Sequence, residues 1–112
     1  MKINTVQKHF NDYIRNRDKN LGCISCGIKP KNPHAGHYLP VKWYSWLRFD
    51  KQNVNLQCPK CNRKNNFIGY RQGLIKKIGI EQVIDLERRG LEGKPKGFSW
   101  TEKRKQKILK SL

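Results

Sequence analysis

The sequence has no long hydrophobic run. No stretch approaches the roughly 18 consecutive apolar residues of a membrane-spanning helix. The N-terminal residues 1–8 contain no apolar core of the kind that a secretory signal peptide requires. These absences disfavour both a membrane protein and a secreted protein, and no membrane partner is expected.

Acidic residues are also scarce. The 112-residue chain has 8 Asp and Glu against 25 Lys and Arg, which gives a formal net charge of +17. The basic side chains repel one another, and a bound polyanion would offset this repulsion. Nucleic acid is therefore the expected partner. The length predicts one domain with a modest core, and a further source of stability is therefore expected.

The four cysteines form two C-x2-C pairs, Cys23/Cys26 and Cys58/Cys61. In a chain without secretory features this pattern favours four thiolates around a zinc ion over two disulfides. A site closed by four protein ligands is structural, and zinc binding would supply the missing stability. Residues 27–57 separate the pairs, well beyond the roughly 15–20 residues of a simple zinc ribbon, so they are expected to hold something else.

The spacing of apolar residues predicts several short elements. An amphipathic helix is expected over residues 4–19, and helices over 62–77 and 80–89. Residues 35–41 and 47–57 are rich in aromatic and branched side chains and predict a two-stranded hairpin.

The C-terminal part predicts one more helix. Ser99 and Glu102 match a capping box, in which the two side chains satisfy free backbone amides at a helix start. The helix expected after Ser99 carries many lysines and arginines, which form a basic face.

The order of these motifs resembles a known group of enzymes. A C-x2-C pair, a strand with a histidine, a strand with an asparagine and a C-x2-C pair followed by asparagine resemble the zinc-stabilised HNH, or ββα-metal, endonucleases. A closer resemblance, over nearly the whole chain, is to the phage NinG/Rap family of recombination nucleases. The segments that carry it are Tyr13–Asp18, Cys23–Gly27, Ala35–Tyr38, Leu47–Asp50, Asn53, Cys58–Asn62, Tyr70–Arg71 and Trp100–Glu102.

This resemblance implies a phage or prophage nuclease that hydrolyses branched DNA, including Holliday junctions, in the cytoplasm of a bacterial host. Its cysteine site is similar to that of phage endonuclease VII. The expected fold is α+β, a single domain 1–112 with a helix within 3–20, a zinc-stabilised ββα-metal (HNH-like) core over 21–78 and a helical segment over 80–112. Because a four-way junction must be cut on two opposed strands, a homodimer is expected.

Hydrolysis of a phosphodiester requires an activated water and a cation that faces the phosphate. We assign the general base to His37, because neutral imidazole accepts a proton near pH 7. Asn53 matches the middle asparagine of the HNH pattern and is expected to orient His37, with Asn55 as a weaker candidate for that task or for DNA contact. Asn62 matches the HNH metal ligand, and its amide oxygen suits catalytic Mg²⁺ or Mn²⁺.

The chain departs from the HNH pattern at the second ligand of this cation. Many HNH proteins have aspartate or histidine immediately before the base, whereas this chain has Gly36. Residues 34 and 36 of a strand point the same way, so His34 is a candidate for the missing ligand, and Asp50 is the alternative. Imidazole in place of carboxylate would shift the preference from Mg²⁺ toward Mn²⁺.

Basic side chains are candidates for contact with DNA phosphates. They are Arg48, Arg63, Lys64, Arg71, Lys103, Arg104 and Lys107. The aromatic side chains of Trp43, Tyr44 and Trp46 are expected to pack rather than to stack on bases. Two other functions stay open: a non-catalytic zinc-finger DNA-binding module, and a sequence-specific HNH nuclease of the homing or restriction type.

Overall fold

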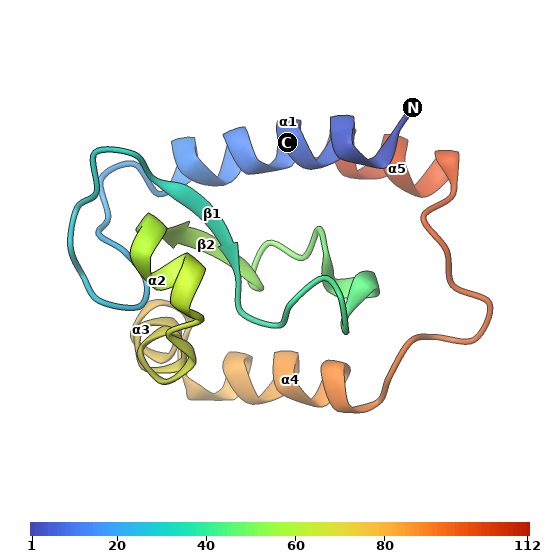
Figure 1. Ribbon diagram of the computed structural model, residues 1–112. Coiled ribbons are helices and arrows are strands. Elements are labelled where there is room, and N and C mark those ends of the chain that lie inside the picture. Colours follow the sequence, from blue (N-terminus) through green and yellow to red (C-terminus); the bar gives the residue numbers. More distant parts are fainter.

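The computed structural model describes all residues 1–112 as five α-helices and a two-stranded sheet (Figure 1). The elements in chain order are α1 (Ile3–Arg17), β1 (His34–His37), a 3-10 helix (Ser45–Leu47), β2 (Val54–Gln57), α2 (Pro59–Lys64), α3 (Phe67–Ile78), α4 (Ile80–Leu91) and α5 (Glu102–Lys110). None of the helices is long and apolar enough to cross a membrane. The fold class is therefore α+β, as the sequence predicts.

The two strands are antiparallel and lie between α1 and α4 (Figure 1). His34 pairs with Gln57 and His37 pairs with Val54. Side chains alternate between the two faces of a strand, so His37 shares one face with Val54, while His34 shares the other face with Gln57. This alternation decides which side chains can meet at the candidate site.

Each face of the sheet is covered by a separate hydrophobic core. Val6, Phe10 and Ile14 recur at helical spacing along α1 and pack against Phe49 and Val54. The second core joins α3 and α4 to the loop that follows β1; its buried members are Tyr38, Leu39, Leu47, Tyr70, Leu74, Val83 and Leu86. The thin sheet is thus held from both sides.

The strands are much shorter than the predicted spans 35–41 and 47–57. The amide of Tyr38 donates to the carbonyl of Asn53, and beyond this bond the chain leaves the sheet. The carbonyl of Pro40 accepts hydrogen bonds from the amides of Trp43 and Tyr44, which closes a turn. The aromatic residues that favoured strands therefore lie in loops, where Tyr38 packs in the core with α3 and α4 and Phe49 packs against α1.

The single helix predicted over residues 62–77 is two helices. Asn65 ends α2 in the left-handed conformation with φ 54°, and the Asn66 side chain accepts from the amide of Gly69 to begin α3. The first of these helices begins at Pro59, earlier than predicted, because the Cys58 sulfur accepts from the amide of Cys61. Asn62 therefore lies within a six-residue helix rather than at the start of a long one.

The predicted capping box is wrong in its residues. Thr101 caps α5, its hydroxyl accepting from the amide of Arg104, and the helix begins at Glu102. Glu102 does not turn back to a backbone amide but pairs with the amino group of Met1. This pair and the packing of Ile108 and Leu109 against the α1 core attach the C-terminal helix to the N-terminal one.

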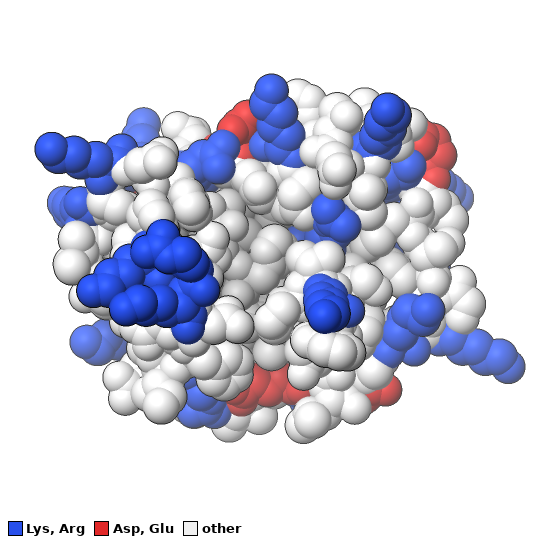
Figure 2. Space-filling view, in the orientation of Figure 1, with Lys and Arg blue, Asp and Glu red and all other residues white.

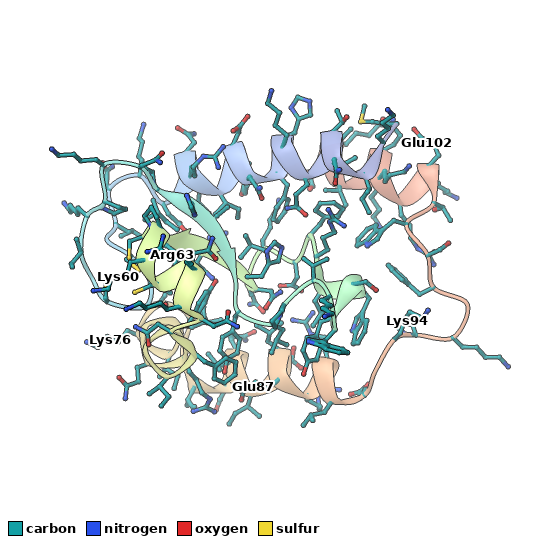
Figure 3. The ribbon with its side chains drawn as sticks, viewed as in Figure 1. Lys60, Arg63, Lys76, Glu87, Lys94 and Glu102 are labelled. Atoms are coloured by element: carbon teal, nitrogen blue, oxygen red, sulfur yellow. The ribbon has the colours of Figure 1, made fainter.

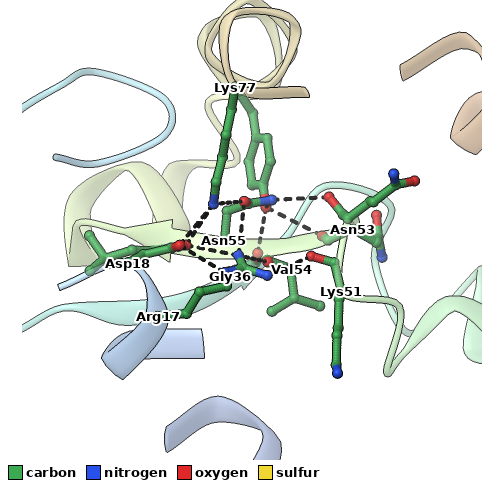
Figure 4. A network of polar contacts seen from close by, with 11 residues as sticks. Arg17, Asp18, Gly36, Lys51, Asn53, Val54, Asn55 and Lys77 are labelled. Carbon is green, nitrogen blue, oxygen red and sulfur yellow. Dashed lines mark hydrogen bonds and ion pairs between the residues drawn. The ribbon is translucent and has the colours of Figure 1, made fainter. Parts of the chain in front are cut away.

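A buried polar network joins α1, β2 and α3 (Figure 4). The Asp18 carboxylate accepts from Arg17, from Lys77 and from the amide of Leu56. The Asn55 side-chain oxygen accepts from Arg17 and Lys77 as well. Asn55 is thus committed to this structural network, and the weaker prediction that it orients His37 is wrong.

We expect Asp18→Asn to lower the free energy of unfolding by about 3 kcal/mol, measured by urea denaturation at pH 7. This is the lower end for breaking a buried ion pair, because the Arg17 and Lys77 side chains keep 26% and 23% of their exposure. The matched control is Asp12→Asn, whose side chain is 57% exposed and pairs only with Arg15. An exposed pair of this kind should change stability by less than about 1 kcal/mol.

The pH dependence of this stability has a definite sign. Burial raises the pKa of Asp18, but the hydrogen bonds from Arg17 and Lys77 outweigh it and leave the pKa below its ordinary value. The carboxylate therefore stabilises the fold fully above its unfolded pKa of about 3.9, and this stabilisation is lost as the pH falls through the lower folded pKa. An equal loss of stability in the Asp12 and Asp18 variants would contradict this interpretation.

Candidate active site

The four cysteine sulfurs form one cluster, with all four atoms within 4.8 Å of one another. Cys23, Cys58 and Cys61 are buried and Cys26 is exposed. Backbone amides of Ser25 and Cys61 point at the sulfurs of Cys23 and Cys58, as is usual around metal-bound thiolates. Four sulfurs at this spacing fit a tetrahedral zinc ion and leave no open coordination position. A zinc ion bound here would therefore be structural rather than catalytic.

This cysteine cluster joins the sheet to α2. Cys58 directly follows β2 and caps α2, so one residue ends the strand and starts the helix. The amide of Ile24, between the first two cysteines, donates to the carbonyl of Leu56 on β2. A metal ion bound here would therefore hold the turn of the first cysteine pair, β2 and α2 as one unit, to which β1 is joined by its pairing with β2.

His34 and Asn62 come together on this unit. The side-chain amide nitrogen of Asn62 lies 3.0 Å from Nδ1 of His34. Because the amide nitrogen can only donate, Nδ1 of His34 is the acceptor in this hydrogen bond. The amide oxygen of Asn62 makes no hydrogen bond, and the side chain is exposed. Two of the predicted cation ligands are therefore adjacent, and one of them has a free oxygen.

His37 ends β1, and its ring is held by the main chain. Nε2 lies 3.0 Å from the carbonyl oxygen of Arg48. A carbonyl can only accept, so Nε2 carries the proton and Nδ1 keeps its lone pair. Burial lowers the pKa of His37, the bond to the carbonyl raises it and the charge of Arg48 lowers it further, so that the net pKa is below the ordinary value. The ring is therefore neutral at pH 7.

The predicted contact between Asn53 and His37 is wrong. Asn53 is fully buried, and its side chain hydrogen-bonds the backbone of Leu39, through both the amide and the carbonyl, and the carbonyl of Leu47. These bonds hold the two ends of the loop together, and Leu47 directly precedes Arg48. Asn53 therefore fixes the segment whose carbonyl orients His37, and it acts on the ring only through that segment.

The predicted alternative ligand, Asp50, is engaged elsewhere. Its carboxylate pairs with Arg89 at 2.6 Å and accepts from the amides of Gln52 and Asn53. These bonds stabilise the turn before β2. Asp50 hydrogen-bonds neither His34 nor Asn62, so of the two candidates for the missing ligand only His34 lies beside Asn62.

The predicted phosphate contacts divide into three groups. Arg63 and Lys64 are exposed on α2, where basic side chains form a dense cluster in Figure 2, and Figure 3 shows Arg63 and Lys60 projecting from this helix. A second group, Lys103, Arg104 and Lys107, is exposed on α5, at the far end of α1 from α2 (Figure 1). The third group consists of arginines that are already bound by hydrogen bonds to other side chains of the protein.

Those bound arginines are Arg48 and Arg71. Arg48 donates to the side chains of Gln7 and Asn4 on α1, and burial lowers its pKa. Arg71 makes two hydrogen bonds to Glu87, which also accepts from the Tyr38 hydroxyl. Their predicted role as free phosphate clamps is therefore less favourable, because a phosphate would have to compete with these existing partners.

The aromatic loop is only partly packed. Tyr44 and Trp46 pack against the α4 core, as predicted. Trp43 is 68% exposed, so for this residue the predicted packing is wrong. Two residues near the site were assigned no role from the sequence: Tyr70, whose buried hydroxyl donates to the carbonyl of Gly36, and Gln57, which lies over Gly36. Only the strand register could have pointed to Gln57.

Taken together, these features define a class: a small α+β protein in which a two-stranded sheet meets a short helix at a candidate four-cysteine metal centre. The family model described as "Bacteriophage Lambda NinG protein" matches residues 2–110. The chain belongs to the NinG family.

Curated relatives agree with this membership. Protein ninG of Salmonella phage P22 is 41% identical over 88 residues, which are 76% of this chain and 43% of that protein. Protein ninG of Escherichia phage lambda is 40% identical over 88 residues, with the same shares of the two chains, 76% and 43%. The chain thus spans less than half the length of these relatives. No solved structure is significantly similar to this chain.

Proposed function

We propose that the chain is a divalent-metal-dependent endonuclease of the HNH type that cleaves branched DNA, Holliday junctions among them. The observation that carries this proposal is the state of His37: a carbonyl holds Nε2, and Nδ1 is left as a base on a neutral ring. A general base needs an unprotonated nitrogen with a free lone pair, and the bond from Nε2 to the carbonyl leaves Nδ1 of His37 in that state.

The cation site supports the same proposal. Asn62 offers an unpaired amide oxygen at the junction of β1 and α2, and Nδ1 of His34 becomes available as a second ligand when it releases the amide of Asn62. A Mg²⁺ or Mn²⁺ ion bound there would polarise the scissile phosphate and stabilise the leaving oxygen. The outer edge of β1 carries no strand, so a DNA backbone that crosses this edge can meet His37 from one face and Asn62 from the other.

In this arrangement each residue of the chain has one task. Nδ1 of His37 takes the proton of the attacking water, and the carbonyl of Arg48 stabilises the resulting imidazolium through the Nε2 proton. Asn53 keeps that carbonyl in place by holding Leu47. Asn62 and His34 hold the cation, and the basic side chains of α2 attract the phosphates.

The charge distribution supports DNA binding over α2 and β1. Basic side chains lie over α2 and along the upper part of the face in Figure 2, and the surface between them is hollowed. Acidic side chains show at the lower margin of that face, where Figure 3 labels Glu87 on α4, and in smaller patches at its upper margin. DNA is therefore expected to avoid α4. The preference for branched substrates rests on the resemblance to recombination nucleases, and a homodimer would cut the two opposed strands.

The zinc-loaded chain should nick a labelled four-way junction in the presence of Mg²⁺ or Mn²⁺ and should leave it intact in their absence. A matched linear duplex serves as the control substrate, and gel electrophoresis under denaturing conditions locates the cuts. Binding without any cleavage would contradict the proposal and favour a zinc-finger DNA-binding module. Cleavage of linear duplex at defined sites, with no response to branches, would favour a sequence-specific HNH nuclease.

A further inference from the structure

Gln57 occupies the space beside Gly36 that a side chain at position 36 would need. A Cβ atom built on Gly36 would lie 1.9 Å from Oε1 of Gln57 and 3.1 Å from its Cβ. Gln57 is the last residue of β2, and only 3% of it is exposed. The glutamine amide therefore lies in the position where the HNH pattern usually places the side chain before the base.

One half of this amide has a partner and the other half has none. Nε2 of Gln57 donates to the hydroxyl of Ser25 at 2.9 Å, within the first cysteine pair. Oε1 accepts no hydrogen bond, although every fully buried side-chain nitrogen and oxygen in the protein has a partner. Oε1 must therefore reach the surface, as a fixed and unpaired oxygen on a nearly buried side chain. Such an oxygen is suited to binding a ligand rather than to stabilising the fold.

The strand register places this oxygen with the other candidate ligands. Gln57 pairs with His34, so their side chains share one face of the sheet. His34 in turn is bonded to Asn62. Gln57 and His34 therefore lie on the same face of the sheet, with Oε1 of Gln57 over Gly36 and the side chain of His34 against Asn62.

We propose that Oε1 of Gln57 is a ligand of the catalytic cation, in place of the carboxylate that this chain lacks at position 36. The inference rests on the proposed function of this site. Gln57 fills the space that a side chain at position 36 would need, so only glycine fits there. The ligand then comes from the neighbouring strand instead. The ligand class is a hard divalent cation, since two of the three donors are amide oxygens.

This ligand set has a consequence for metal binding. Asn62, Gln57 and neutral His34 bring no negative charge to the cation, unlike a site with a carboxylate. The free protein should therefore bind the cation weakly, and the phosphate of bound DNA should supply the missing charge. By linkage, the cation and the DNA should each raise the affinity of the protein for the other. The imidazole should favour Mn²⁺ over Mg²⁺.

The test measures Mn²⁺ binding to the zinc-loaded chain by electron paramagnetic resonance, separately from cleavage. Gln57→Met should weaken Mn²⁺ binding at least about tenfold, which is the lower bound for the loss of even an outer partner of a metal site. Gln57→Glu should strengthen it by a similar factor, because it adds a charged oxygen at the same place. Gln72→Met, an exposed glutamine on α3, is the matched control and should bind Mn²⁺ like the wild type.

A second variant keeps the test decisive if Gln57→Met does not fold. Gly36→Asp combined with Gln57→Ala moves the carboxylate back to position 36 and removes the side chain that fills its space, so it should bind Mn²⁺ at least as tightly as the wild type. If the wild type cleaves the junction but Gln57→Met and Gln57→Glu bind Mn²⁺ with unchanged affinity, Gln57 is not a ligand. That result would leave the proposed function standing. Absence of both Mn²⁺ binding and cleavage in the wild type would overturn the proposed function.

Discussion

Replacing His37 with alanine should lower the rate of junction cleavage at least about 100-fold, the lower bound for the loss of a general base. The expectation follows from the geometry of the ring, whose Nε2 is bound to the Arg48 carbonyl while Nδ1 is left as the only basic nitrogen. The measurement is a single-turnover rate with saturating Mn²⁺. Zinc content and the melting temperature should be recorded for each protein, so that unfolding is distinguished from lost chemistry.

The matched control is His9→Ala, which removes an exposed histidine from α1 and should leave the cleavage rate unchanged. The pH profile gives an independent readout. Burial holds the pKa of His37 below its ordinary value, so the rate for the wild type should rise with pH through that lowered pKa and level off at a lower pH than an ordinary histidine would give. Full cleavage by the His37 variant would show that another group activates the water.

Removing the zinc ion should unfold the chain. Zinc bound by thiolates contributes on the order of 10 kcal/mol, which is comparable with the entire stability of a small domain. The cysteine cluster also joins the turn of the first cysteine pair to β2 and α2, and no disulfide replaces it. We therefore expect Cys61→Ser, or a strong chelator, to abolish the cooperative thermal transition seen by circular dichroism.

Lys60→Ser is the control for this experiment, because Lys60 is an exposed residue between Cys58 and Cys61. This variant should retain one zinc ion per chain and the melting temperature of the wild type. A chelated protein that keeps a cooperative transition and its helical signal would contradict a structural role for zinc, and would leave the four sulfurs as free thiols.

Sequence reasoning succeeded where a structure depends on local spacing. The apolar residues of α1 and α4 recur at helical intervals, and both helices form close to their predicted spans. The two C-x2-C pairs each place two sulfurs on one tight turn, and the fold unites them in one cluster. Motif order also placed His34 and Asn62 among the candidate cation ligands, and their side chains meet.

Sequence reasoning failed where a side chain binds backbone far along the chain. Asn53 has the right position for an HNH asparagine, yet its amide holds Leu39 and Leu47 instead of His37. The break at Asn65 could not be predicted either, since asparagine adopts a left-handed conformation only in particular surroundings. Likewise Asp50 looked available as a ligand, and only the approach of Arg89 from α4 shows that it is paired.

The family, the excess of positive charge and the four candidate sulfur ligands can be predicted without a structure, because they depend on the identity of residues and on short intervals between them. The free nitrogen of His37 and the oxygen that fills the space beside Gly36 are visible only in the folded chain. Both depend on the register of two strands and on a loop closed by a buried amide. Those contacts are made between segments that no local pattern relates.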